Sequence, residues 1–111
     1  EAGRRLQRAA ELVSREASSP ARLSVLGATA LWHAHNRRFD DAMASFRSAV
    51  ELASETGLRA MQAEMRFDLG RALRGLGRTE DASRLLSESA DYYEKAGLRF
   101  WAERARSLAS R

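Results

Sequence analysis

The sequence contains no cysteine, which removes several kinds of chemistry at once. Without a thiol the chain can form no disulfide, no cysteine metal site and no thiolate nucleophile. Long apolar runs are lacking too, since no segment approaches the roughly 18 residues of a membrane-spanning helix, and no signal peptide is visible. We therefore expect a cytoplasmic protein in a reducing compartment.

Proline, aromatic residues and lysine are scarce. One proline and an aromatic content of 7% favour a helical domain whose core is built of small and aliphatic side chains. Only Lys95 among the 19 basic residues is a lysine, and the arginines are spread along the chain among 15 acidic residues. The net charge of +4 therefore predicts a solvated arginine-rich surface, and we expect contact with DNA only through a separate domain of the parent chain.

Motifs for catalysis and cofactor binding are also lacking. Neither G-x-x-x-x-G-K-S/T nor G-x-G-x-x-G occurs, so Gly70, Gly75 and Gly77 are interpreted as packing and turn glycines. His33 and His35 stand two residues apart on a predicted helix, where they point to different faces and cannot share a metal. We expect His33 to pack between helices and His35 to face a groove or solvent. The sequence predicts neither an enzyme nor a cofactor or metal site.

An internal repeat of forty residues organises the chain. Gly57-Leu58-Arg59 recurs as Gly97-Leu98-Arg99, and Ala9-Ala10-Glu11-Leu12 aligns with Ala49-Val50-Glu51-Leu52 in the same register. Within each repeat the apolar residues are three or four positions apart, which is the spacing of an amphipathic helix. Each repeat therefore predicts a pair of helices.

Several residues mark the ends of these helices. Ser19, followed by Pro20, and Thr79 are predicted N-caps, while Gly57 and Gly97 stand where a left-handed residue is needed after a helix. We expect a single helical-repeat domain over residues 1–111, with a partial repeat 1–17, full repeats 18–57 and 58–97, and a terminal helix 98–110. The predicted helices span residues 2–17, 20–36, 39–56, 59–75, 79–96 and 98–110.

Acidic pairs and aromatic residues have structural interpretations in this scheme. Asp40-Asp41 and Glu80-Asp81 could suggest acid–base chemistry, but both begin a helix, where negative charge interacts favourably with the helix dipole. The aromatic residues have helical spacing and are expected to pack in the core or between repeats rather than to stack on bases. Those considered for base stacking are Trp32, Tyr92, Tyr93, Phe100 and Trp101.

The repeats resemble tetratricopeptide repeats, whose pattern places Leu-Gly in the first helix and alanine and aromatic residues in the second. The small pairs Gly70/Ala82 and Ala30/Ala42 would let the helices of a hairpin approach closely. The resemblance implies an all-α, right-handed superhelix of antiparallel helical hairpins with about six helices. The period exceeds the usual length of about 34 residues. The usual tryptophan position holds Leu26 in one repeat and Arg66 in the next. The usual proline position holds Ser54 and then Glu94. The matching positions are Leu69, Gly70, Leu73, Ala82, Leu86 and Ser89, and in the preceding unit Ala30, His33, Ala42, Phe46 and Ala49.

Repeats of this length are similar to those of the large LuxR-type transcriptional regulators related to MalT. In that family an ATPase module precedes the repeats and a DNA-binding helix-turn-helix follows them. Tyr93–Arg106 resembles the end of that repeat region, and Trp101-Ala102-Glu103-Arg104-Ala105 is its most specific part. The resemblance implies a region that binds a protein, peptide or small ligand and relays this to an output domain. A stand-alone adaptor or scaffold protein is the alternative.

In the tetratricopeptide family partners bind a concave surface that is lined mainly by first helices. The ligand-facing positions, carried over to this chain, are basic with one exposed aromatic residue, which favours an acidic or amphipathic peptide. Residues 2–17 form a second helix without its first helix, so we also expect exposed apolar surface there and self-association through it. The carried-over positions are Ser24, Leu31, His35, Glu64, Phe67, Arg71, Arg74 and Arg104.

Overall fold

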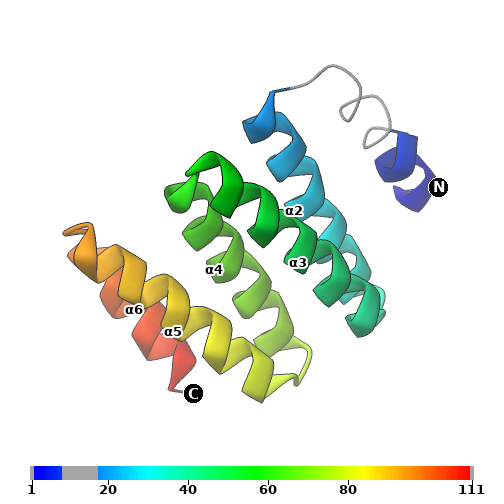
Figure 1. Ribbon diagram of the computed structural model, residues 1–111. Helices are drawn as coiled ribbons and strands as arrows, with labels where there is room; N and C mark the ends of the chain where they lie inside the picture. The colour runs from blue at the N-terminus through cyan, green and yellow to red at the C-terminus, as the bar shows by residue number, and fades with distance from the viewer. Residues whose placement is uncertain (1, 9–17, 111) are drawn as a thin grey trace. The chain divides into compact units, whose positions relative to one another are not determined.

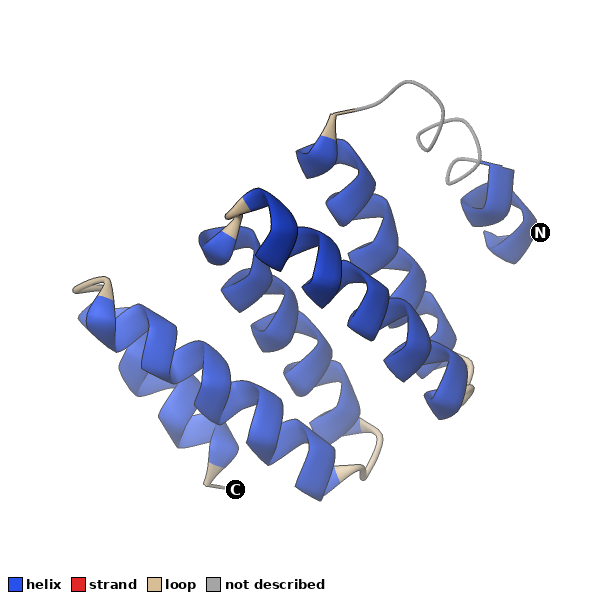
Figure 2. Cartoon of the chain, in the orientation of Figure 1, coloured by secondary structure: helices blue, strands red, loops and turns tan. Residues whose placement is uncertain are grey.

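A computed structural model describes residues 2–8 and 18–110 and shows an all-α protein, with no strand in these ranges (Figures 1 and 2). Residues 2–8 are helical, and residues 9–17 of the first predicted helix lie outside the described residues. The other five predicted helices are confirmed, each end to within one residue. They are α2 (Ser19–His35), α3 (Phe39–Thr56), α4 (Arg59–Gly75), α5 (Thr79–Lys95) and α6 (Arg99–Ala109).

The chain divides into two compact units, residues 1–61 and 62–111. In the first unit α2 packs against α3 as a helical hairpin, and in the second unit α5 packs against α6. Most of α4 belongs to the second unit, where it lies against α5 through Gly70 and Leu86. The single domain over residues 1–111 and the right-handed superhelix stay predictions, because each unit is described by itself.

Glycines in the left-handed conformation end two of the repeats. Gly57 has φ 72° and Gly97 has φ 78°, as the sequence predicts. At each the chain turns sharply, so that the amide of the next residue reaches back to the last helical turn. Leu58 N donates to Ala53 O over 3.0 Å, and Leu98 N donates to Tyr93 O over 2.8 Å.

The two predicted N-caps are wrong by one residue. Ser18 precedes α2, so Ser19 is its first residue, and Arg78 precedes α5, so Thr79 is its first residue. Neither helix has a side-chain hydrogen bond at its cap. Pro20 in the first turn costs no intrahelical hydrogen bond, because an amide there has no partner within the helix.

Small residues hold the helices of each hairpin close together. In the first unit Ala30 on α2 and Ala42 on α3 are almost completely buried. In the second unit a Cβ on Gly70 would lie 2.8 Å from Leu86 Cγ and 3.4 Å from Ala82 O, so this approach of α4 to α5 requires glycine. Close contact at Gly70/Ala82 is therefore confirmed. All the positions matched to the tetratricopeptide pattern are buried except His33, which is half-buried.

Candidate interaction surface

The residues predicted to line a partner surface fall into two groups, one in each unit. On α2, Ser24 and His35 are exposed and Leu31 is half-buried. These three belong to the first unit, whereas the second unit holds the other five. The five come from α4 and α6, which are first helices of consecutive repeats, and they are Glu64, Phe67, Arg71, Arg74 and Arg104.

Phe67 is the centre of an aromatic cluster rather than the exposed aromatic residue that the sequence predicts. It is only 5% exposed, because two rings cover it. The Trp101 ring on α6 lies 6.0 Å from the Phe67 ring, nearly perpendicular to it, and the Tyr93 ring on α5 lies 6.4 Å away. Edge-to-face contacts of this kind stabilise aromatic pairs beyond the area they bury. Phe67 therefore joins α4 to the two later helices.

The exposed aromatic residues are on α6 instead. Phe100 is 67% exposed, so its expected packing in the core or between repeats is wrong, whereas Trp101 is 44% exposed but packs between repeats as expected, against Phe67. The Phe100 and Trp101 rings meet edge to face with centroids 5.3 Å apart. The sequence contains a signal for Trp101, since it precedes Arg104 by three residues and so shares its face of α6. Asp68 is the other member of this surface that the predicted set lacks.

Arg74 is not available to a partner in the way that the sequence predicts. Its guanidinium donates to Ser83 Oγ over 3.0 Å and to the Ala109 carbonyl over 3.1 Å. Ser83 Oγ donates to the same carbonyl over 2.8 Å. These hydrogen bonds connect α4, α5 and the last residue of α6, so half-buried Arg74 has a structural role in the second unit.

Arg71 and Arg104 remain exposed and form no hydrogen bond or ion pair with another described residue. The Arg71 guanidinium lies 5.5 Å above the Phe67 ring, a cation–π contact that leaves its edge open to solvent. We call the surface of the second unit formed by six residues the α4–α6 face. These residues are Glu64, Phe67, Asp68, Arg71, Trp101 and Arg104.

The acidic end of the α4–α6 face carries two carboxylates beside Tyr93. Burial raises the pKa of the Asp68 carboxyl, the charge of Glu64 adds to the rise, and Arg71 opposes it. Burial also raises the pKa of the Tyr93 phenol, and the charges of Glu64 and Asp68 raise it further. The two carboxylates therefore lie near each other at the edge of the aromatic cluster.

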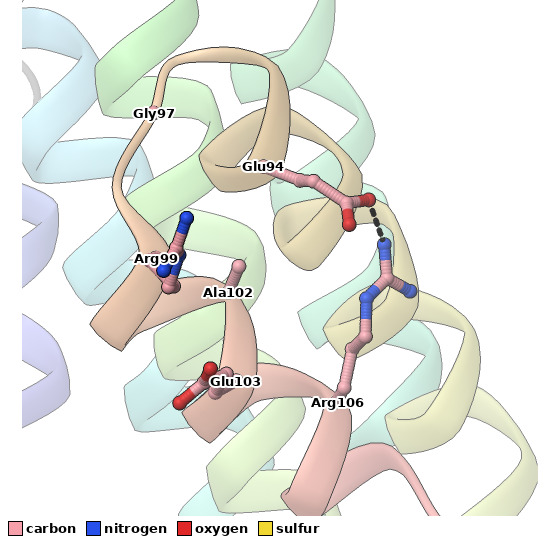
Figure 3. A pocket seen from close by; sticks show the side chains of 6 residues that line it. All are labelled: Glu94, Gly97, Arg99, Ala102, Glu103 and Arg106. Atoms are coloured by element: carbon pink, nitrogen blue, oxygen red, sulfur yellow. Dashed lines mark hydrogen bonds and ion pairs between the residues drawn. The ribbon is translucent and has the colours of Figure 1, made fainter.

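An open pocket of about 380 Å³ lies on the other side of α6 (Figure 3). Arg106 donates to Glu94 Oε2 over 2.7 Å and to Asp91 Oδ1 over 3.1 Å. The hydrogen bonds to both carboxylates, that to Asp91 first, raise the pKa of Arg106 above its usual value. Arg99 and Glu103 complete a balanced set of charges that are all open to solvent. The pocket offers a ligand neither burial nor one sign of charge.

A second open pocket, of about 300 Å³, belongs to the first unit. Trp32 and His33 line it together with residues of the 2–8 segment. The Arg38 guanidinium lies 5.6 Å above the Trp32 ring. His33 is half-buried, and its buried Nδ1 has no hydrogen-bond partner among the described residues, whereas His35 is exposed as predicted.

Metal sites and membrane spans were sought over the described part of the chain. No three side chains of histidine, aspartate or glutamate there are grouped so that they could hold a metal ion. None of the helices in the same ranges combines the length and the apolar character needed to cross a membrane. The chain was also compared with protein-family models, with curated proteins and with solved structures, and none of the three comparisons finds a match.

Proposed function

We propose that this chain is a protein-interaction region built from helical repeats, and that its partner binds the α4–α6 face. The contact between Phe67 and Trp101 carries the proposal, because it joins the first helices of two consecutive repeats. Trp101 stays 44% exposed beside it, the Arg71 guanidinium lies over the Phe67 ring, and exposed Arg104 follows Trp101 by about one helical turn. A half-exposed tryptophan next to arginines is the composition that protein interfaces favour.

The α4–α6 face also supports a more specific proposal. In it, the chain is the sensor region of a bacterial LuxR-type transcriptional regulator in the cytoplasm. Trp101 and Arg104 belong to the stretch that resembles the end of that family's repeats. In this proposal a protein, peptide or small ligand binds the repeats, and this binding is relayed to an output domain that contacts DNA. The partner segment is acidic or amphipathic, because the two arginines without ion pairs would attract carboxylates.

A labelled amphipathic peptide that carries leucine and glutamate tests the binding site by fluorescence polarisation. We expect it to bind the full chain and to lose affinity when Arg71 and Arg104 are both replaced by glutamate. A peptide with lysine in place of glutamate is the control for charge, and R47E/R59E is the control for the loss of two exposed arginines elsewhere. Equal binding of both peptides, or equal loss in both variants, would contradict a site on the α4–α6 face.

The coding sequence on both sides of the segment distinguishes the regulator from the adaptor. A nucleotide-binding module upstream and a helix-turn-helix downstream would support the regulator. Stop codons or further repeats on both sides would support a stand-alone adaptor or scaffold and leave the proposed binding face unchanged.

A further inference from the structure

The charges on the α4–α6 face follow an order along α4. Glu64, Phe67, Asp68 and Arg71 are spaced by three and four residues, so they share one face of the helix. Glu64 lies in the half of this face nearer the start of α4, Arg71 lies in the other half, and Asp68 lies close to the middle. With a rise of about 1.5 Å per residue, Glu64 and Arg71 are roughly 10 Å apart along the axis. The midpoint between them falls at Phe67 and Asp68.

An aromatic contact lies at the middle of this face, beside Asp68. Trp101 contacts Phe67 there, and Leu98, Phe100 and Trp101 are the large apolar side chains that stay exposed among the described residues, at 45%, 67% and 44%. All three stand at or just before the start of α6, where the Phe100 and Trp101 rings are in contact. Exposed apolar side chains gathered in this way, with charges around them, mark interaction surfaces rather than ordinary surface.

We infer that the α4–α6 face binds a second copy of this chain around a twofold axis that passes close to Phe67 and Asp68. The two α4 helices then run antiparallel, so that Glu64 of each copy meets Arg71 of the other. A twofold contact requires a surface that is complementary to itself, and a face with one acidic half and one basic half meets this requirement. Trp101 of both copies lies near the axis, which gives an apolar centre and a charged rim.

The charges on the face favour a second copy over an acidic segment as the molecule that covers it when no partner is bound. An acidic segment would interact with Arg71 and Arg104 and leave Glu64 without an opposite charge, whereas the antiparallel copy offers an arginine to Glu64 as well. The inference uses the same face as the proposed function, so pairing and partner binding exclude each other. It also differs from the self-association that residues 2–17 predict.

Charge reversal with sedimentation velocity tests the pairing. The full chain is expected to form dimers as its concentration rises, and E64R or R71E alone is expected to weaken dimerisation about tenfold, because each creates two like-charge contacts. The double variant E64R/R71E restores both contacts and should dimerise like the unaltered chain. An equal mixture of the two single variants should form heterodimers for the same reason.

A cysteine near the axis tests the geometry independently, and the absence of native cysteine makes the experiment clean. D68C should be joined to its own copy by a short bis-maleimide, while E88C, on an exposed part of α5, should react more slowly. Circular dichroism confirms that both variants fold. The inference would be overturned by a chain that stays monomeric. It would also be overturned if charge reversal left dimerisation unchanged and the two cysteine variants cross-linked equally well. Peptide binding by the E64R variant at concentrations where it is monomeric would show that the proposed function survives without the pairing, because this variant keeps Arg71 and Arg104.

Discussion

Gly70 shows how a single missing side chain sets the distance between two helices. Its α-carbon faces Leu86, which is fully buried on α5. We expect G70A to lower the free energy of unfolding by about 1–3 kcal/mol, because the new methyl group would force a well-packed core apart. Urea denaturation of the variant and the unaltered chain measures this difference.

Gly75 is the matched control, since it also lies on α4 but a Cβ there meets nothing within 4 Å. G75A is expected to be neutral or to stabilise by up to about 1 kcal/mol through helix propensity. If G70A and G75A unfold at the same urea concentration, the close approach of α4 and α5 does not depend on glycine.

The raised pKa of the Asp68 carboxyl predicts that the stability of the chain depends on pH. Its folded-state pKa is raised, so the folded chain holds this proton more tightly than the unfolded chain does, and stability falls as pH rises above the ordinary value of 3.8. D68N removes the charge and should therefore raise the urea midpoint at neutral pH and change it little at about pH 3. An unchanged difference between the two chains across this range would contradict the assignment.

Residue burial is the level at which the sequence alone predicts least. Spacing correctly assigns Phe67 and Arg71 to one face of α4, but it predicts Phe67 to be exposed. Its burial depends on Tyr93 and Trp101, which approach from α5 and α6. Phe100 is misjudged for the converse reason, because helical spacing cannot say whether a neighbouring helix covers a side chain. Long-range contacts, which no local pattern encodes, decide both cases.

At the scale of elements, the sequence predicts almost everything that is described. Apolar spacing, first-turn acids and glycine at helix ends are local signals, and they suffice to bound α2 to α6. The N-caps predicted at Ser19 and Thr79 are wrong by one residue, since Ser18 precedes α2 and Arg78 precedes α5 and neither helix has a side-chain hydrogen bond at its N-cap.

Helices α4 and α6 occupy equivalent positions in consecutive repeats, forty residues apart. They differ on the side against which the second helix of a repeat packs. Ala63 on α4 is 1% exposed and Gly70 contacts α5. The equivalent residues, Glu103 on α6 and Ser110 just after it, are polar and exposed. An apolar second helix would bury the Glu103 carboxylate without a partner, which is costly. This side of α6 is therefore suited to water, whereas its other side, with Trp101, is suited to a partner.

Arg74 connects three elements, which gives a prediction at this scale. R74A removes hydrogen bonds to Ser83 and to the end of α6 and is expected to cost about 1–3 kcal/mol of stability. R71A, on the same helix, loses only an exposed cation–π contact and should cost about 0.5 kcal/mol. Urea denaturation distinguishes them, and equal losses would show that Arg74 does not hold the end of α6 in place.

At the scale of the whole molecule, net charge and charge pattern predict different behaviour toward DNA. A net charge of +4 and a pI of about 10.6 favour attraction to phosphates. Within the second unit, however, arginines alternate with acids, as at Arg106 with Asp91 and Glu94. Arginines that already pair with carboxylates neutralise few phosphates, so binding should be weak.

We therefore expect labelled duplex DNA to bind weakly at low ionic strength and to dissociate by about 150 mM salt, where charges more than about 8 Å apart are screened. Fluorescence polarisation across a salt series measures this, with a duplex of unrelated sequence as the control. Retention at that salt concentration, or preference for one duplex, would mean that the repeats contact DNA themselves. The proposal that the repeats bind a partner while a separate domain binds DNA would then be wrong.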